Sequence, residues 1–524
     1  MYDLYIHNAT IVDGTGRKRY RAHVGVTCGK IVEIGAVPKK QAKRIIDAEG
    51  KVLAPGFIDM HSHSDTMILV NPEAESKINQ GVTTEVIGNC GNSLAPLAGE
   101  SLTFVDDHLV EYDLKRTWAS VEQYLAAVEA ARPALNMAML AGHGTIRRNI
   151  LGTANRAPKP SEMEDMEKIL KKALLQGAFG MSTGLIYPPG FYGDTSELIS
   201  LGRVLKKHRG LYASHIRGEG PTLLKAMEEI IAIGQNSRCP VHVSHHKAIG
   251  KEQWGKVEKT LTMIDEARSK GIDITGDVYP YEATNTLLQT FLPRWVHEGG
   301  VETMLNRLDQ EDTVSKIKER FTTGRHRHRS WENVVVSNAP CHPAWEGKDL
   351  SIIAKSKSQD VPSTIIDIIT GESGKASVII FQISEDDICR VLQHPAMMIG
   401  SDGSSLTMAG KFVNGKPHPR NFGTFPRVLK RYVKNEKVLS LEEAINKMTF
   451  MPAKRLGLSK RGLVLPGYYA DLVLFDPDQI DDCSDYQNPR QCPMGIDYVM
   501  VHGNVAVEKS NFTGIFEGRV LRRK

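Results

Sequence analysis

Two histidines directly follow an apolar stretch near the start of the chain. Phe57 and Ile58 belong to the stretch, and His61 and His63 follow it in the pattern His-x-His. In an extended strand, residues i and i+2 point to the same side, so both imidazoles can reach one ion. Neutral imidazole is a common ligand of zinc and similar metals. Because this motif is short, its interpretation as a metal site depends on other parts of the chain.

Other polar side chains stand in the same position, at the ends of further short apolar runs. They are Cys90 after residues 82–88, His215 after 211–214, His245, His246 and Lys247 after 240–244, and Asp402 shortly after 396–400. In barrel enzymes, functional side chains come from the carboxyl ends of the strands. Five such clusters in one chain therefore predict a single shared metal site.

The residue types in these clusters suit a hydrolytic metal site. Cys90, His215 and His245 form a Cys-His-His set, and three protein ligands with one open position are typical of catalytic zinc. Such a metal makes a water nucleophilic near neutral pH and polarises a carbonyl. Asp402 is suited to accept the proton of that water and to deliver it to a leaving amine. This chemistry fits hydrolysis of an amide or related C–N bond.

Two further histidines need separate interpretation. His245 and His246 are adjacent, so their side chains diverge; we prefer His245 as the ligand because it ends the apolar strand, with His246 as the alternative. His143 follows the third apolar run, and we expect it in a polar network rather than among the ligands.

The elements that must position these residues form a regular alternation. Short apolar runs lie at 57–60, 82–88, 135–141, 178–183, 211–214, 240–244, 272–278 and 396–400. Segments with apolar residues at spacings of three and four, typical of helices, lie between them. Eight alternating strands and helices predict an α/β fold, a (β/α)8 TIM-like barrel. Alternation alone also allows an open doubly wound sheet, although no GxGxxG follows a strand.

The two ends of the chain differ from the middle. Residues 1–54 and 461–524 contain short alternating strands separated by turn residues. We expect one small β-sandwich domain built from both ends around a barrel of residues 55–460; two separate β modules are the alternative. About 115 residues separate the seventh and eighth apolar runs, more than a plain crossover needs. An inserted subdomain or lid, at about 285–345, is therefore expected.

Composition limits the classes of function. The 524 residues are 41% hydrophobic and 24% charged, as in ordinary globular enzymes, and the net charge of +5 argues against a nucleic-acid partner. No apolar run approaches 18 residues, which predicts no membrane span. Seven scattered cysteines without a CxxC pair, and a start without the features of a signal peptide, favour the cytoplasm. The oligomeric state is left open.

Several motifs taken together resemble a known family. Residues 56–63 (Gly-Phe-Ile-Asp-Met-His-Ser-His), 88–91 (Gly-Asn-Cys-Gly), 214–217 (Ser-His-Ile-Arg), 244–247 (Ser-His-His-Lys) and 400–403 (Gly-Ser-Asp-Gly) resemble, in this order, the amidohydrolase superfamily. More narrowly, they are similar to the D-aminoacylase (N-acyl-D-amino-acid deacylase) family. The likeness runs nearly end to end, and it is specific because other amidohydrolases usually have a carboxylated lysine where this group has a cysteine.

The resemblance implies an activity and a role for each matching position. The implied activity is zinc-dependent hydrolysis of N-acyl-D-amino acids to a carboxylate and a free D-amino acid; the preference for the D-hand rests on the resemblance alone. The implied roles are Cys90, His215 and His245 as ligands of one tight Zn²⁺, His61 and His63 as a second, weak site, Asp402 as the acid/base, and Lys247, Tyr279 and Arg420 as holders of the substrate carboxylate. Arginine offers a carboxylate two parallel donors, and lysine adds a point charge.

The sequence departs from the family pattern near the expected substrate pocket. Seventeen residues separate Asp402 from Arg420, and we expect the loop 404–416 among them to reshape the pocket. Asn285 stands where a hydroxyl donor to the substrate is expected, and Tyr187 joins it as a predicted substrate contact. Two other functions remain as alternatives: a hydrolase of cyclic amides such as dihydropyrimidines or hydantoins, and a non-catalytic assembly protein that has lost its metal.

Overall fold

Eight parallel strands form a barrel in the computed structural model, which describes residues 1–35, 41–323 and 329–523. In spatial order they are β6 (Phe57–Asp59), β7 (Val82–Ile87), β8 (Asn136–Gly142), β9 (Gly180–Gly184), β10 (Leu211–His215), β11 (Val241–Val243), β12 (Ile274–Val278) and β16 (Met397–Ile399). Spatial order follows chain order, as in a barrel and unlike a doubly wound sheet. Just after the ends of β6 and β16, Ser62 and Gly403 form a parallel bridge that joins the two edge strands. The barrel prediction is confirmed.

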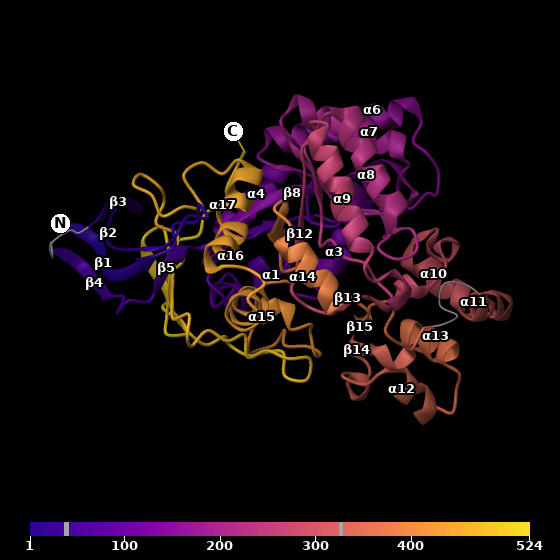
Figure 1. The fold of residues 1–524 in the computed structure, drawn as a ribbon. Coiled ribbons are helices and arrows are strands. Elements are labelled where there is room, and N and C mark those ends of the chain that lie inside the picture. Colours follow the sequence, from indigo (N-terminus) through magenta and orange to yellow (C-terminus); the bar gives the residue numbers. More distant parts are fainter. Residues whose placement is uncertain (36–40, 324–328, 524) are drawn as a thin grey trace.

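Helices cover the outside of the barrel (Figure 1). They include α4 (Val121–Ala130), α5 (His143–Leu151), α6 (Pro160–Leu175), α7 (Thr195–Lys207), α8 (Leu223–Ser237), α9 (Lys256–Ser269), α14 (Glu385–Gln393), α16 (Leu441–Met448) and α17 (Phe450–Leu456). Shorter or peripheral helices are α1 (Met67–Val70), α2 (Glu75–Ile78), α3 (Glu100–Val110) and α15 (Arg420–Arg427), which continues into a π-helical segment, Val428–Asn435. Some helix starts are capped by side chains, as at Asp194, whose side chain accepts from the Glu197 amide. Within the described ranges, no helix has both the length and the apolar character that crossing a bilayer requires.

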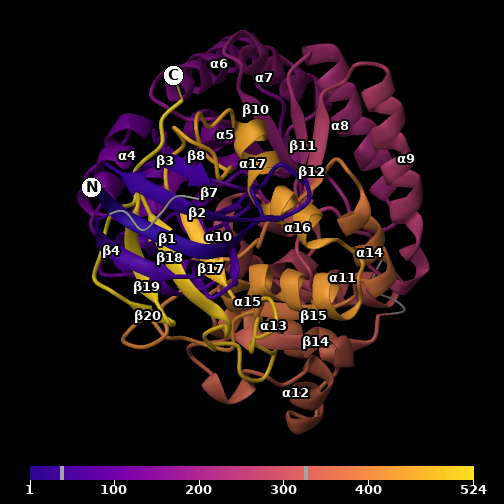
Figure 2. The ribbon, with the colours of Figure 1, turned by 60° about the vertical axis from the view of Figure 1, so that its left-hand side comes forward.

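Both ends of the chain contribute to one nine-stranded sheet. The first part supplies β1 (Tyr2–Ile11), β2 (Tyr20–Thr27), β3 (Lys30–Gly35), β4 (Ala42–Asp47) and β5 (Val52–Pro55); the last part supplies β17 (Leu472–Phe475), β18 (Ile496–Val501), β19 (Asn504–Glu508) and β20 (Asn511–Phe512). Strand β5 pairs in parallel with β1 and in antiparallel fashion with β17, so the ends are not two separate modules. Figure 2 shows the indigo and yellow strands side by side. The domain borders at 54/55 and 460/461 stay a prediction.

A separate unit lies between β12 and β16 (Figure 1). Its antiparallel sheet has the order β13 (Ala283–Leu287), β15 (Ser377–Phe381), β14 (Val334–Asn338), and α10 (Gly300–Leu308), α11 (Glu311–Thr323), α12 (Leu350–Ser356) and α13 (Val361–Gly371) accompany it. These elements enclose an apolar core of their own. Because the central strand β15 comes last in the chain, the unit extends to residue 381, beyond the end expected near 345.

Candidate metal centre

The Cys90 thiol lies at the centre of a group of imidazoles. Its Sγ is 3.3 Å from His61 Nε2, 3.4 Å from His245 Nε2 and 3.7 Å from His215 Nδ1. The ligating atoms of Cys90, His61, His245 and Asp402 all lie within 4.8 Å of one another. His61 follows β6, Cys90 follows β7, His245 follows β11 and Asp402 follows β16, all at the carboxyl side of the barrel. His215 ends β10 at the same side. The structure therefore brings the predicted clusters together.

Unusual backbone conformations aim these side chains inward. Cys90, His245 and Asp402 have φ values of 51°, 37° and 52°, in the left-handed region that costs a non-glycine residue on the order of 1 kcal/mol. Around Cys90 the turn also depends on glycine: a Cβ on Gly88 would stand 2.0 Å from the Leu140 carbonyl oxygen, and one on Gly91 would stand 2.6 Å from a backbone nitrogen. The chain can therefore make this sharp turn only with small residues on both sides of the cysteine.

The electrostatics favour the thiolate form of Cys90. Burial raises its pKa, but the neighbouring His61 and His245 lower it more, so the pKa of the thiol falls well below its usual value. A buried thiolate among imidazole nitrogens, with a carboxylate beside them, is a donor set that suits zinc. These residues therefore fit a zinc ion.

Asp402 links the centre to two cations. Its Oδ1 is 2.9 Å from His63 Nε2, and its Oδ2 is 2.7 Å from an Arg420 guanidinium nitrogen. Burial raises the pKa of Asp402, yet Arg420, His245 and His63 together hold it well below its usual value. The pKa of His63 rises to about 9, because contacts with Asp402 and Cys90 outweigh the effect of burial. Asp402 is thus an ionised carboxylate beside the thiolate, in position to accept a proton.

Lys247 and Arg420 both lie over the ring of Tyr279. The Arg420 guanidinium carbon is 5.0 Å and the Lys247 Nζ 5.4 Å from the centre of the Tyr279 ring. All three side chains are buried. Two cations and a phenol in so small a volume are suited to a carboxylate ligand.

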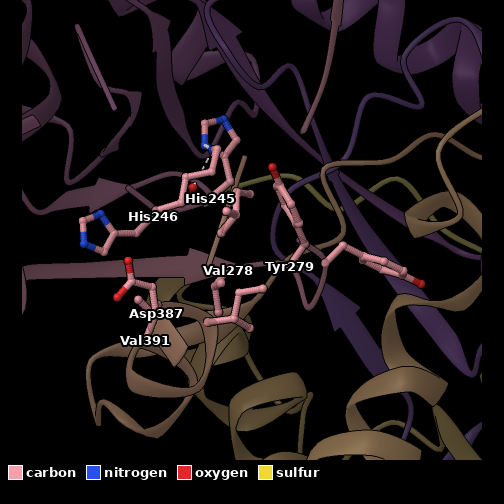
Figure 3. Close-up of a pocket in the computed structure, with 10 residues that line it drawn as sticks. His245, His246, Val278, Tyr279, Asp387 and Val391 are labelled. Carbon is pink, nitrogen blue, oxygen red and sulfur yellow. Dashed lines mark hydrogen bonds between the residues drawn. The ribbon is translucent and has the colours of Figure 1, made fainter. Parts of the chain in front are cut away.

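His245 and His246 point in different directions, as Figure 3 shows. The His246 Nε2 lies 2.7 Å from the Thr260 hydroxyl, in the wall of a cavity that Asp387 also lines. Burial lowers the pKa of His246 to about 4. His245, rather than His246, therefore faces Cys90. His143 lies in a separate buried network, with its Nε2 2.7 Å from Glu197.

Glu219 is a residue that the sequence reasoning missed. Its Oε1 is 3.1 Å from His245 Nδ1 and accepts from the Lys247 Nζ at 2.6 Å, and its Oε2 is 3.8 Å from His215 Nε2. Carboxylates in this position orient ligand imidazoles and fix which ring nitrogen faces the metal. The only signal in the sequence was an acidic residue four positions after His215.

Asp277 plays a similar part on the other side of the centre. Its Oδ1 accepts from the His245 amide at 2.8 Å, and its Oδ2 lies 3.5 Å from His61 Nδ1 and 2.8 Å from His242 Nε2. Burial raises the pKa of Asp277, but His61 and His242 lower it much more. Its signal in the sequence was a carboxylate inside the apolar run 272–278.

Asn285, predicted as a substrate contact, bonds within the inserted sheet. Its amide donates to the Val378 carbonyl at 3.0 Å and to the Ser337 hydroxyl at 3.1 Å, both within the inserted sheet. Successive residues of a strand point to opposite faces. The next residue, Thr286, therefore faces the other way, with its Oγ1 3.4 Å from the Tyr187 hydroxyl. The Tyr187 ring lies 5.4 Å from that of His215, so Tyr187 does reach the centre.

Comparisons with known proteins agree with this geometry. A model of the amidohydrolase family matches residues 44–328 and 396–507, leaving out much of the inserted unit. Over 99% of its length the chain is 36% identical to an N-acyl-D-glutamate deacylase of Alcaligenes xylosoxydans xylosoxydans, of which it covers 96%. The chain belongs to the D-aminoacylase family of amidohydrolases. A D-aminoacylase of the same organism is also 36% identical, with 100% of this chain and 98% of that enzyme covered.

A solved family structure shares the fold over the whole length. It is the N-acyl-D-glutamate deacylase from Bordetella bronchiseptica, 35% identical, with a TM-score of 0.85 and 100% of both chains covered. That enzyme is complexed with zinc and with a phosphonate inhibitor that mimics the tetrahedral intermediate of the reaction. An L-hydantoinase from Arthrobacter aurescens, at 15% identity and a TM-score of 0.58, shares the fold alone.

Proposed function

We propose that this enzyme hydrolyses the amide bond of N-acyl-D-amino acids and releases a carboxylate and the free D-amino acid. The observation that carries the proposal is the position of the Cys90 thiolate and Asp402 beside Arg420 and Tyr279. One side of the site suits a metal and a reacting amide, and the adjoining side suits a free carboxylate. The deacylase relatives, similar over the full length, support this substrate class.

We assign the tight zinc ion to Cys90, His215 and His245, and a second, weaker position to His61 and His63. When bound, zinc supplies a Lewis acid that polarises the scissile carbonyl and makes a water nucleophilic near neutral pH. Glu219 and Asp277 hold the imidazoles in the orientation that leaves the correct ring nitrogen facing the centre.

The chain's own residues account for orientation and proton transfer. Arg420, Lys247 and Tyr279 hold the α-carboxylate of the substrate, which fixes the scissile amide next to Asp402. Asp402 accepts one proton from the attacking water and donates it to the amine nitrogen as the C–N bond breaks. The carboxylate therefore ends the cycle in its starting form.

The Arg420 guanidinium contacts Asp402 through one nitrogen, at 2.7 Å, which leaves its other N–H groups for a substrate carboxylate. Tyr187, whose ring lies 5.4 Å from that of His215, and the neighbouring Thr286 are the proposed contacts for the rest of the substrate, in place of Asn285.

The seven cysteines all lie in the described residues and are free, as a reducing compartment allows. Oxidation of Cys90 would remove the thiolate ligand. A cytoplasmic location is therefore part of the proposal.

The test is hydrolysis of paired N-acetyl-D- and N-acetyl-L-amino acids with zinc supplied and metal content measured on the same sample. Release of free amino acid from the D-series alone is the expected result, because carboxylate, carbonyl and side chain give three fixed points that distinguish enantiomers. Release from hydantoin or dihydrouracil instead would establish the cyclic amide hydrolase. No release from any substrate, together with no bound metal, would establish the non-catalytic protein.

A further inference from the structure

A buried lysine bonds to residues next to the metal centre but to none of the proposed ligands. Lys77, on α2, is fully buried, and its Nζ donates to Asp59 Oδ2 at 2.8 Å and to the Ser401 hydroxyl. The Glu85 carboxylate is farther away, at 3.7 Å. A buried ammonium is tolerated only where it is paired and hydrogen-bonded. The proposed mechanism uses neither this lysine nor its partners, so their burial needs another explanation.

The Asp59 carboxylate accepts hydrogen bonds from the segments that follow the first and the last barrel strand. Its Oδ1 accepts from the Ser401 amide at 2.8 Å and from the His61 amide at 3.2 Å. Its Oδ2 accepts from the Ser401 hydroxyl at 2.5 Å, in addition to Lys77. Asp59 ends β6, and Ser401 follows β16. One carboxylate therefore ties the first barrel strand to the last.

This tie lies where the barrel has its weakest backbone pairing. Every other pair of neighbouring barrel strands shares a ladder of at least three residue pairs. Between the β6 and β16 edges, the described residues show one isolated bridge, Ser62 with Gly403. His61 and His63 stand on one edge of this seam and Asp402 on the other. Two backbone hydrogen bonds cross it, from the Asp402 amide to the His61 carbonyl and from the His63 amide to the Gly403 carbonyl, both 2.8 Å long. With so short a backbone pairing, side-chain contacts carry more of the positioning here than between the other barrel strands.

The seam contacts also hold a strained residue. Asp402 has φ 52°, and such conformations persist only where the surroundings fix them. Its amide donates to the His61 carbonyl at 2.8 Å, while the following Gly403 amide donates to the Ser401 hydroxyl at 3.0 Å. The Ser401 hydroxyl thus joins the Asp59 carboxylate directly to the turn that contains Asp402.

We propose that Lys77, Asp59 and Ser401 form a positioning network that holds the Asp402 carboxylate opposite His61 and His63. The network rests on the proposed function only in that Asp402 is taken as the acid/base. None of the three residues touches the substrate; they act through the position of Asp402. A loss of about 10- to 100-fold in kcat is expected when the carboxylate moves by about 1 Å.

The test compares Ser401→Ala with a control variant on helix α16, at Lys447, that perturbs the other end of β16. Lys77→Met is unsuitable as the first variant, because it leaves Asp59 buried without its cation and is expected to prevent folding. Lys447 is also buried and also bonds to the β16 region, but at the strand's other end, where its Nζ donates to the His394 and Met397 carbonyls at 2.6 and 3.0 Å. Lys447→Met therefore perturbs β16 away from the seam.

We expect Ser401→Ala to keep its zinc and its KM within about twofold, and to lose kcat by the factor given above. Amide hydrogen exchange of residues 400–405 should accelerate in Ser401→Ala and stay unchanged in Lys447→Met. Unchanged exchange in Ser401→Ala overturns the inference, as does an equal loss of kcat in both variants. If the unmodified enzyme releases no D-amino acid, the proposed function fails, and the exchange measurement still decides whether the network positions Asp402.

Discussion

At the scale of single residues, the thiol of Cys90 determines the character of the centre. A thiolate is a softer ligand than oxygen and brings its negative charge without any modification. The price of a buried negative charge is reduced here by imidazoles at 3.3 and 3.4 Å, which also lower the thiol's pKa. The ligand set therefore depends on the cysteine more than on any one histidine.

Cys90→Ala should remove the tight metal, because it deletes the only anionic ligand of the proposed zinc set. Zinc content of the purified variant is the measurement. Cys239→Ala is the matched control: this cysteine is also buried, but its Sγ contacts Ser237 rather than the centre. Full zinc occupancy in Cys90→Ala would show that the ligands are assigned wrongly.

Asp402→Asn should keep one zinc ion but lose turnover by roughly 10²- to 10⁴-fold, because the amide cannot accept the proton of the attacking water. The variant is nearly isosteric with the carboxylate and leaves the proposed zinc ligands in place. Metal content and kcat on one preparation give the answer. Near-normal turnover with zinc bound would remove Asp402 from the acid/base role.

Arg420→Ala should raise KM by about 10- to 100-fold, since a charge-assisted hydrogen bond to the substrate carboxylate contributes about 1.5–3 kcal/mol. A larger fall in kcat than in 1/KM would instead mean that Arg420 acts mainly through its 2.7 Å contact with Asp402. Steady-state kinetics separates the two effects, and an unchanged KM would place the carboxylate site elsewhere.

At the scale of elements, strand β13 shows what the order of residues cannot settle. The alternation of side chains is known in advance, but whether Asn285 or Thr286 faces the centre depends on how β13 pairs with β15, some 90 residues later. The position of the loop 404–416 likewise depends on contacts with residues far away in the chain. Its carbonyls at Asn414 and Gly415 accept from Arg490, and the next residue's amide donates to Ser337, contacts with two distant parts of the chain.

Thr286→Val should mainly affect catalysis, whereas Asn285→Ala should mainly affect stability. Losing the Thr286 hydroxyl beside Tyr187 should lower kcat/KM with little change in Tm. Losing the Asn285 amide should lower stability by about 1 kcal/mol and leave KM near normal, because its bonds stay inside the inserted sheet. Kinetics and thermal unfolding of both variants provide the measurement; a raised KM in Asn285→Ala alone would restore the original expectation.

At the scale of the whole molecule, the barrel was predictable because its strands are buried on both faces. Such strands appear as continuous apolar runs, and all eight coincide with strands of the structure. The polar residues after those runs could be identified because a barrel gathers its strand ends at one rim. Glu219 and Asp277 could not, because their importance depends on which ring nitrogen of His245 or His61 faces away from Cys90. The end of the inserted unit was missed because β15 pairs with strands distant in the chain.

Removing residues 463–524 should prevent folding of the remainder. Strand β17 pairs with β5, which ends at Pro55, and only Gly56 separates it from β6. The loss of β17 therefore exposes a strand edge close to His61. The final segment also contacts the barrel: the Leu521 amide donates to the Met137 carbonyl and the Arg523 amide to the Gly177 carbonyl. Thermal unfolding and zinc content of the truncated chain, beside the full chain, test this. A truncated chain with a native Tm and bound zinc would show that the barrel folds alone and that the predicted border near 460 separates independent domains.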